Sequence, residues 1–490
     1  MRKLPETVLR FIASIVFLGS MLCCFANKSE AADQTYGKGF RTDSNGWIFL
    51  HIEGSPSRRG EQHGYLLATE IRTYIEALKL YVTSNSKKTW NDYRLAASDI
   101  MLPKIEKEYV NELKGILKGM GKANVTGYDI PDLVALNSFM EIQNYFYSVS
   151  SKFEPYRNIF RRTINRGEGA VEELSHCSAF IATGSATSDG GIVLAHNTWV
   201  DYVLGGNIII DLKPSRGLRM LMQCIGPGLI HSYTDFAINS AGIVMSETTI
   251  SYANGFDVEG IPEFVRMRKA AQYSKSIDDF YSIIRKGNNG GYANTWLVGD
   301  IKTNEIAKIE LGLKNVAFYR SKDGYYDGMN YVDDSKMIRE ECSPSLWDVS
   351  NGSWPVNLSG GNSCSARRMR WFSLLDQNKG LIDAENAKVF LADQINQMTG
   401  QPSFGGKGLM CRLEILPSPN AYPFGATDGK VVTSELARNM SFWARIDHPD
   451  GSTFEWADFF TAYPQFAWQK PYLHDLKDNP WTLFKSTKIK

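Results

Sequence analysis

The pattern of apolar and polar positions changes partway along the chain. Between about residues 60 and 147, apolar residues recur three and four positions apart, as in 105–120 and 130–145. This spacing is that of amphipathic helices. Asp129-Ile-Pro resembles a helix start, with a proline in the first turn. The first part of the chain is therefore predicted to be helical.

After residue 177 the pattern becomes that of strands, separated by Gly, Pro, Asn and Asp. Strands are predicted at 178–183, 191–197, 207–212, 218–225, 234–239, 242–248, 293–298 and 305–311. Helices are predicted at 262–271, 276–285, 365–375 and 384–398. Strands grouped together and flanked by helices favour a layered α+β architecture.

The first thirty-one residues predict an export signal rather than a folded element. Basic residues precede an apolar run from Phe11 to Ala26, and Ser29-Glu30-Ala31 offers a cleavage site of the small-x-small kind, as in secretory signal peptides. The run is shorter than the roughly 18–20 apolar residues of a membrane-spanning helix, and a retained N-terminal anchor is the alternative. We expect an exported protein, whether secreted, periplasmic or lysosomal.

The 490-residue chain is predicted to comprise a signal peptide (1–31), a helical N-terminal segment (32–176) and a catalytic chain (177–490). A charged, exposed linker is expected at about 151–176. Lys and Arg (54) nearly balance Asp and Glu (53), so no nucleic-acid surface is expected. Neither a metal cluster nor a phosphate-binding glycine motif stands out, and we predict no metal and no cofactor.

Cysteine usage singles out Cys177. Beyond the signal peptide the chain holds five cysteines, an odd number for an exported protein, so one unpaired thiol is expected. Cys177 is the candidate for that thiol, and an inert buried cysteine is the alternative reading. The other four could form two disulfides in any of three pairings: Cys224, Cys342, Cys364 and Cys411.

Cys177 could become an N-terminus. If the His176–Cys177 bond is cut, Cys177 carries both a thiol and an α-amine of unperturbed pKa about 7.7–8.0. That amine could deprotonate the thiol, the arrangement of N-terminal-nucleophile (Ntn) enzymes. The exposed linker before it suits a processing site.

The first predicted hairpin places polar groups near this thiol. If the loop between the strands is centred near residue 187, Cys177 lies opposite Asn197 and beside His196. A tight turn at 188–191 would place Tyr202 opposite instead. Both registers bring the segment 196–202 close to Cys177.

Seven motifs in chain order resemble the phospholipase B-like family, over essentially all of 177–490. The helical part before them matches more loosely. The motifs are His176-Cys177-Ser178-Ala179, Leu194-Ala195-His196-Asn197-Thr198-Trp199, Asp235-Phe236, Ser246-Glu247-Thr248-Thr249-Ile250, Gly291-Tyr292-Ala293-Asn294-Thr295-Trp296, Ser365-Ala366-Arg367 and Asp428-Gly429-Lys430-Val431-Val432-Thr433-Ser434.

The resemblance implies a four-layer αββα Ntn-hydrolase sandwich, made as a precursor and cut before Cys177. Related cysteine enzymes include penicillin V acylase, bile salt hydrolase and penicillin acyltransferases. Cys177 would be the nucleophile, its α-amine the general base, and an N-to-S acyl shift at the His176 carbonyl would begin self-cleavage. His196 would orient the amine or the substrate, Asn294 would donate to the oxyanion, and Arg367 would favour the thiolate.

Some of these positions have a plainer reading. His196 could make a structural hydrogen bond at a strand end, and Arg367 could form a surface salt bridge. The family often has Asn-Asn where this chain has Ala293-Asn294. Four further residues match positions that would line a substrate site: Asn197, Trp199, Thr248 and Thr249. The alternative for Thr248 and Thr249 is that they are ordinary strand threonines.

The implied chemistry is acyl transfer to water through an acyl-thioester on Cys177. The substrate would be a small molecule or a lipid, either a phospholipid ester or an N-acyl amide, reached through a transient contact with a membrane surface. The two processed fragments would stay associated. The rival functions are an acyltransferase or linear amide hydrolase and a non-catalytic secreted lipid-binding protein. A papain-like protease is disfavoured, because its cysteine signature is missing.

Overall fold

The computed structural model describes most of the chain as one unit that begins at Gln34. The predicted signal peptide and linker lie outside the described residues, as does Asp235. The described ranges are 34–149, 177–233, 236–251, 253–342 and 363–487.

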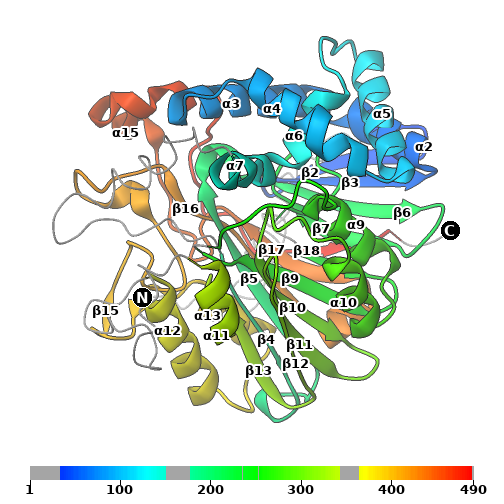
Figure 1. Ribbon diagram of the computed structural model, residues 1–490. Helices are drawn as coiled ribbons and strands as arrows, with labels where there is room; N and C mark the ends of the chain where they lie inside the picture. The colour runs from blue at the N-terminus through cyan, green and yellow to red at the C-terminus, as the bar shows by residue number, and fades with distance from the viewer. Residues whose placement is uncertain (1–33, 150–176, 234–235, 252, 343–362, 488–490) are drawn as a thin grey trace, which may run out of the picture. The chain divides into compact units, whose positions relative to one another are not determined.

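Two large β-sheets form the centre of the unit (Figure 1). The ten-stranded sheet is antiparallel except where β3 runs parallel to β6. Its strands, in order across the sheet, are β1 (Gln34–Tyr36), β2 (Gly39–Ser44), β3 (Trp47–Gly54), β6 (Ile208–Pro214), β7 (Met220–Cys224), β8 (Ala237–Asn239), β9 (Ile243–Thr249), β10 (Asn294–Asp300), β11 (Glu305–Leu311) and β12 (Val316–Ser321).

The second sheet is antiparallel throughout. Its six strands, in order, are β13 (Gly324–Gly328), β4 (Ser178–Thr183), β5 (Val193–Asp201), β16 (Phe424–Thr433), β17 (Ser441–Ile446) and β18 (Thr482–Lys485). A separate small pair joins β14 (Ile395–Asn396) to β15 (Gln401–Pro402).

The two sheets pack face to face through alternate side chains of their strands. One buried cluster holds Ile181 and Leu194 of the six-stranded sheet together with Val244 and Leu297 of the ten-stranded sheet. Because successive side chains of a strand point to opposite faces, Phe180 and Ala182 face away from the ten-stranded sheet and belong to a second buried cluster. These strands are thus buried on both faces, as inner layers must be.

Helices cover both outer faces, on opposite sides of the strands in Figure 1. Phe180 contacts Trp371 of α12 (Ser363–Gln377) at a ring-centroid distance of 5.1 Å. On the ten-stranded sheet, Trp296 contacts Phe280 of α10 at 5.2 Å. The order helix, sheet, sheet, helix confirms the predicted four-layer αββα class. The covering helices are α11 (Ser335–Glu341), α12 and α13 (Ala384–Leu391) on one side, and α9 (Glu263–Tyr273) and α10 (Ile277–Arg285) on the other.

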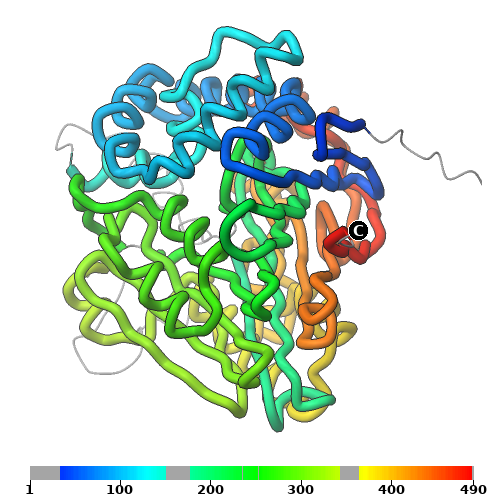
Figure 2. Tube along the Cα trace, turned by 90° about the vertical axis from the view of Figure 1, so that its right-hand side faces the viewer, coloured from blue at the N-terminus to red at the C-terminus, as the bar shows by residue number. Residues whose placement is uncertain are grey.

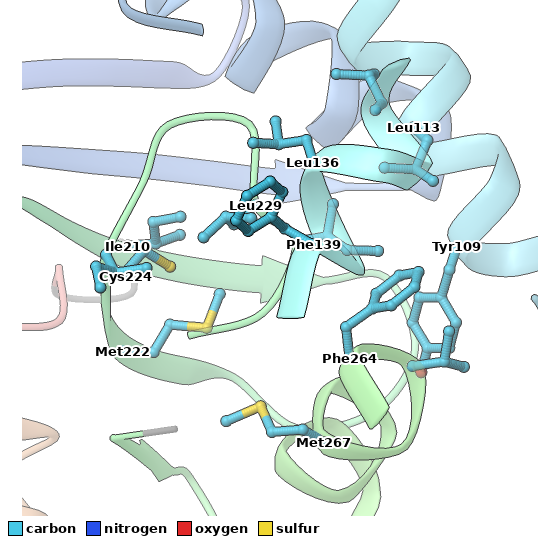
Figure 3. Packing of buried hydrophobic residues seen from close by; sticks show 14 of the residues in the cluster. Tyr109, Leu113, Leu136, Phe139, Ile210, Met222, Cys224, Leu229, Phe264 and Met267 are labelled. Atoms are coloured by element: carbon cyan, nitrogen blue, oxygen red, sulfur yellow. The ribbon is translucent and has the colours of Figure 1, made fainter. Parts of the chain in front are cut away.

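The N-terminal helices gather at one end of the strands (Figure 2). Helices α2 and α5 approach closely where Gly64 has no side chain. A Cβ at Gly64 would lie only 1.9 Å from the carbonyl oxygen of Ile116. Figure 3 shows Leu136 and Phe139 of these helices between Met222 of β7 on one side and Tyr109 beside Phe264 on the other, all in one buried cluster. The helices are α2 (Pro56–Leu66), α3 (Ala68–Asn85), α4 (Trp90–Ala96), α5 (Lys107–Lys122), α6 (Ile130–Asn137) and α7 (Phe139–Ser148); α14 (Ser434–Arg438) and α15 (Trp456–Ala462) follow near the C-terminus.

The structure departs from the predicted elements at several places, and no strand was predicted where β12, β13, β16, β17 and β18 lie. The helix expected over 130–145 is two helices, α6 and α7, because the chain bends at Ser138, whose hydroxyl donates to the Val134 carbonyl at 2.6 Å. The helix expected over 384–398 ends at Leu391. Residues 34–54 form three strands within the segment predicted to be helical, and β3 finds its partner β6 far along the chain.

The cysteines also differ from expectation. All five described cysteines are thiols, so the two expected disulfides are absent among them. Each lies buried in the fold, which leaves Cys177 one of several protected thiols rather than a lone one.

The first hairpin follows the wider of the two predicted registers, shifted by one residue. Ser178 pairs with Asn197 and Ala179 with His196. Extending this register by one residue places Cys177 opposite Thr198. The alternative with Tyr202 opposite Cys177 is wrong.

Candidate active site

Cys177 lies at the head of β4 in an unusual backbone conformation. Its φ is +73°, a left-handed value that is uncommon for residues other than glycine. The residue is 3% exposed. Backbone strain of this kind is concentrated at functional sites, where surrounding contacts hold it.

The charges around the thiol have opposing effects. Burial and the Glu247 carboxylate raise the pKa of Cys177 well above its ordinary value, and Asp428 acts in the same direction. The Trp199 backbone N–H and the Lys430 ammonium both favour the thiolate. The buried thiol of the uncut chain is therefore protonated at neutral pH and needs a base to react.

His196 lies beside this thiol, between the two sheets. Its cross-strand neighbours are Ala179 on β4 and Lys430 on β16, and its side chain is fully buried. Burial and the Lys430 charge lower the pKa of His196 well below its usual range. The imidazole is therefore neutral, and it can orient a neighbour without adding charge.

Arg367 of α12 contacts the backbone of Cys177. Its Nη1 donates to the Cys177 carbonyl oxygen at 2.6 Å and to the Ser178 hydroxyl at 3.1 Å. Its Nη2 donates to Asn330 Oδ1 at 2.9 Å, and the guanidinium stacks 4.5 Å from the Trp199 ring centroid. The arginine is fully buried, so the alternative of a surface salt bridge is wrong. It holds the head of β4 in place.

Two of the expected substrate-binding residues are engaged elsewhere in the fold. Asn197 points away from the inter-sheet space, and its Nδ2 donates to the carbonyl oxygens of Leu391 at 2.6 Å and Leu409 at 3.0 Å. Trp199 supports the guanidinium of Arg367 and is 1% exposed. Both side chains therefore build the wall behind the thiol.

The remaining expected residues lie on β9 and β10. Thr248 faces the six-stranded sheet, where a Cβ on Gly328 would lie 2.7 Å from its Oγ1. Thr249 contacts the Tyr292 hydroxyl at 2.7 Å. Asn294 pairs with Thr249 across the ladder, and the described residues offer no hydrogen-bond partner to either atom of its buried amide. Asn294 thus has an unused donor, although it shares the sheet face of Thr249 rather than that of Thr248.

Sequence reasoning missed a buried polar cluster beside the thiol. Lys430 of β16 donates to Thr198 Oγ1 at 2.6 Å, to Gln223 Oε1 of β7 at 3.4 Å and to Asp428. Lys430 and Asp428 belong to one of the seven motifs but received no role. Their spacing of two along a strand was the available signal, since it places both on one face.

The described ranges contain neither a cluster of metal-ligating side chains nor a helix that could span a membrane. No three His, Cys, Asp or Glu side chains there converge as metal ligands would. None of the helices described in the structure combines the length and apolar character needed to cross a bilayer.

Comparison with known families agrees with the motifs. A family model described as Phospholipase B matches residues 60–394. This match confirms the resemblance inferred from the seven motifs, and it includes much of the helical part.

Individual relatives are distant. An "Uncharacterized protein" of Archaeoglobus fulgidus is 25% identical over 331 residues, 62% of this chain and 50% of its own. Human phospholipase B-like 1 is 25% identical over 410 residues, 76% of this chain and 68% of its own. The matches therefore span about half to two thirds of these curated relatives. Among solved structures, a mutant conjugated bile acid hydrolase from Clostridium perfringens aligns with a TM-score of 0.33 and 10% identity, over 55% of this chain and 89% of that one.

Proposed function

The chain belongs to the phospholipase B family, and on that premise we propose that it is an exported, self-processing Ntn hydrolase. It cleaves an acyl ester or amide bond through an acyl-thioester on Cys177. The observation that carries this proposal is the setting of Cys177. Its strained, buried backbone is held at the head of β4 by Arg367.

The proposed reaction begins with processing. The Cys177 thiol attacks the His176 carbonyl, and the acyl group moves from nitrogen to sulfur. This shift breaks the His176–Cys177 peptide bond and frees the α-amine of Cys177. Water then cleaves the resulting thioester, which releases the His176 carboxylate and frees the thiol. Arg367 restrains the Cys177 carbonyl, so the strained geometry survives while the preceding bond is broken.

The mature enzyme then uses the same thiol on its substrate. The α-amine takes the thiol proton, the thiolate attacks the substrate carbonyl, and the amine returns the proton to the leaving alcohol or amine. Asn294 is our candidate oxyanion donor, because its buried amide is unused within the described part of the chain. Water, activated by the same amine, releases the acid.

We propose that the two fragments stay associated after cleavage. Strands β1–β3 precede the cut and share the ten-stranded sheet with strands that follow it. The pairing of β3 with β6 extends over seven residue pairs, from Ile48 with Ile208 to Gly54 with Pro214. Separation would expose that ladder to water.

The acyl donor is proposed to be a lipid or an N-acyl amide, reached at a membrane surface where it is a lipid. An acyltransferase would share the acyl-thioester but pass the acyl group to an amine. A concentration series of acceptor amines separates the two, because an acyltransferase binds its amine and forms the amide with saturation, whereas a hydrolase acylates amines only in proportion to their concentration. A non-catalytic lipid-binding protein would bind the lipid equally well with or without the Cys177 thiol.

Intact-mass analysis of the purified protein beside Cys177→Ala tests the proposal. We expect two fragments from the natural chain, one beginning near Ala32 and one at Cys177, and a single uncut chain from the variant. A natural chain that stays uncut and still hydrolyses acyl substrates would rule out the Ntn mechanism.

A substrate panel then addresses specificity. Palmitoyl-lysophosphatidylcholine, a dipalmitoyl phosphatidylcholine vesicle and penicillin V represent a monoacyl lipid, a diacyl lipid and an N-acyl amide. Release of free acid from one of them, absent with Cys177→Ala, would assign the substrate class. Binding of lipid without release of acid from any probe would favour the lipid-binding alternative.

A further inference from the structure

The inter-sheet face of the six-stranded sheet carries two polar rows next to Cys177. One row runs across the strands from Ala179 through His196 to Lys430. The next row continues from Cys177 to Thr198, by extension of the register, and on to Asp428, which pairs with Thr198. Directly opposed side chains in such rows have Cβ atoms about 4.5–5.5 Å apart.

Lys430 reaches from its own row into the row of the thiol. Its Nζ lies 2.6 Å from Thr198 Oγ1, on the cross-strand neighbour of Cys177. The same ammonium spans the inter-sheet space to Gln223 Oε1 of β7 at 3.4 Å. The Lys430 ammonium is thus hydrogen-bonded to both sheets, and one of its partners, Thr198, is the cross-strand neighbour of Cys177.

Lys430 is also a poorly compensated cation. It is fully buried, and Asp428 is the one carboxylate with which it forms a salt bridge among the described residues. Burial lowers the pKa of Lys430, and the charges of Asp428, Cys177 and Glu247 oppose that shift. Glu247 also raises the pKa of Cys177, so at the thiol it acts against Lys430. Charge that is not neutralised locally acts strongly over short distances inside a protein.

We propose that Lys430 is a positioning residue for Cys177: the buried ammonium of Lys430 provides a positive charge that favours the thiolate of Cys177. This inference rests on the proposed nucleophilic role of Cys177. The same charge disfavours protonation of the α-amine that processing would create, so it keeps that amine able to accept the thiol proton. Arg367, by contrast, binds the carbonyl side of Cys177.

The test measures the thiol directly. The processed protein is alkylated with iodoacetamide over a range of pH, and modification of the peptide that begins at Cys177 is followed by mass spectrometry. For Lys430→Met we expect the midpoint of the rate profile to rise by about one to two pH units. Lys430→Arg should restore a midpoint near that of the natural chain. The acid limb of kcat/KM should move with the thiol.

Lys308→Met is the matched control. Lys308 is a second buried lysine on an inner strand, β11, but its salt bridges are to Glu310, Asp327 and Asp333. Its removal should leave the Cys177 midpoint unchanged. An unchanged midpoint in folded Lys430→Met would overturn the inference, and so would an equal shift in both variants.

A second variant covers the case in which Lys430→Met does not fold. Gln223→Glu keeps the lysine but places a carboxylate beside its Nζ, so the midpoint should move in the same direction by a smaller amount. An unchanged midpoint there would overturn the inference. The alkylation needs no substrate: a shift without turnover of any probe contradicts the proposed function alone, and turnover without a shift contradicts only the role of Lys430.

Discussion

Two buried lysines, one in each sheet, show how differently the same side chain can be used. Lys308 of β11 lies 2.6 Å from Asp333, 3.5 Å from Glu310 and 4.0 Å from Asp327. Lys430 of β16 forms one salt bridge, with Asp428, and is otherwise bound by the neutral groups of Thr198 and Gln223.

Their protonation equilibria move in opposite directions. Burial disfavours the ammonium of both, but three carboxylates outweigh burial at Lys308 and raise its pKa. At Lys430 burial prevails over the charges of Asp428, Cys177 and Glu247 and lowers the pKa. A neutralised cation stabilises its own cluster, whereas an under-neutralised one also acts on its neighbours, of which Cys177 is one.

The largest expected effect is the loss of the thiol itself, through which Lys430 is proposed to act. Cys177→Ala should abolish both self-cleavage and hydrolysis, because no other group at the head of β4 can form the thioester. The measurement is intact mass together with acid release.

Cys224→Ala is the control, since Cys224 is an equally buried thiol on β7. It should be cleaved and active. Full activity of Cys177→Ala would contradict the proposed role of Lys430, because the enzyme would then not use the thiol on which Lys430 is proposed to act.

The two lysines should differ next in stability. Lys308→Met leaves three carboxylates without their cation and Lys430→Met leaves one. Breaking a buried ion pair costs about 3–5 kcal/mol. We expect the free energy of unfolding to fall by the upper end of that range for Lys308→Met and the lower end for Lys430→Met. Denaturant titration of the two purified variants measures it. A larger loss for Lys430→Met would mean that its cluster is the structural one.

Two asparagines sharpen the same distinction on a smaller scale. Asn197 donates both amide hydrogens to the carbonyl oxygens of Leu391 and Leu409. Asn197→Ala leaves these buried carbonyls without that donor, so it should lower the free energy of unfolding by about 1–3 kcal/mol. Asn294 has no hydrogen-bond partner among the described residues, so Asn294→Ala breaks no hydrogen bond and should lower the free energy of unfolding less than Asn197→Ala does. It should instead lower kcat about 100- to 1,000-fold if the amide serves the oxyanion.

Denaturant titration and initial rates, taken on both variants, separate the two effects. A stable Asn294→Ala enzyme with undiminished kcat would remove Asn294 from the site. The oxyanion donor would then have to be another group, because Ala293 carries no side-chain amide.

Much of the fold could be predicted because its signals are local. Strand β4 was predicted at its observed bounds, since its six apolar and small residues lie between clear turn residues. Strands β1–β3 were missed, because β3 is stabilised by pairing with β6, more than 150 residues away. Burial of the five thiols depends on the packed fold in the same way, and no spacing rule could show that the described cysteines form no disulfide with one another.

The site was predicted as far as its motifs reached. The hairpin places the strand that carries His196 next to the strand that follows Cys177, in a register one residue away from the predicted one. The orientation of Asn197 and the stack of Arg367 on Trp199 depend on elements far along the chain. Lys430 stood in a quoted motif, but its partner Gln223 lies in the other sheet, and only the packing of the two sheets joins them.

The most direct test of the nucleophile is to trap its acyl intermediate. The processed protein is mixed with p-nitrophenyl octanoate, quenched in acid and mapped by mass spectrometry. We expect one octanoyl group on the peptide that begins at Cys177, removed by neutral hydroxylamine and absent from Cys177→Ala. An octanoyl group on any other residue, with none at Cys177 while substrate is turned over, would contradict the account.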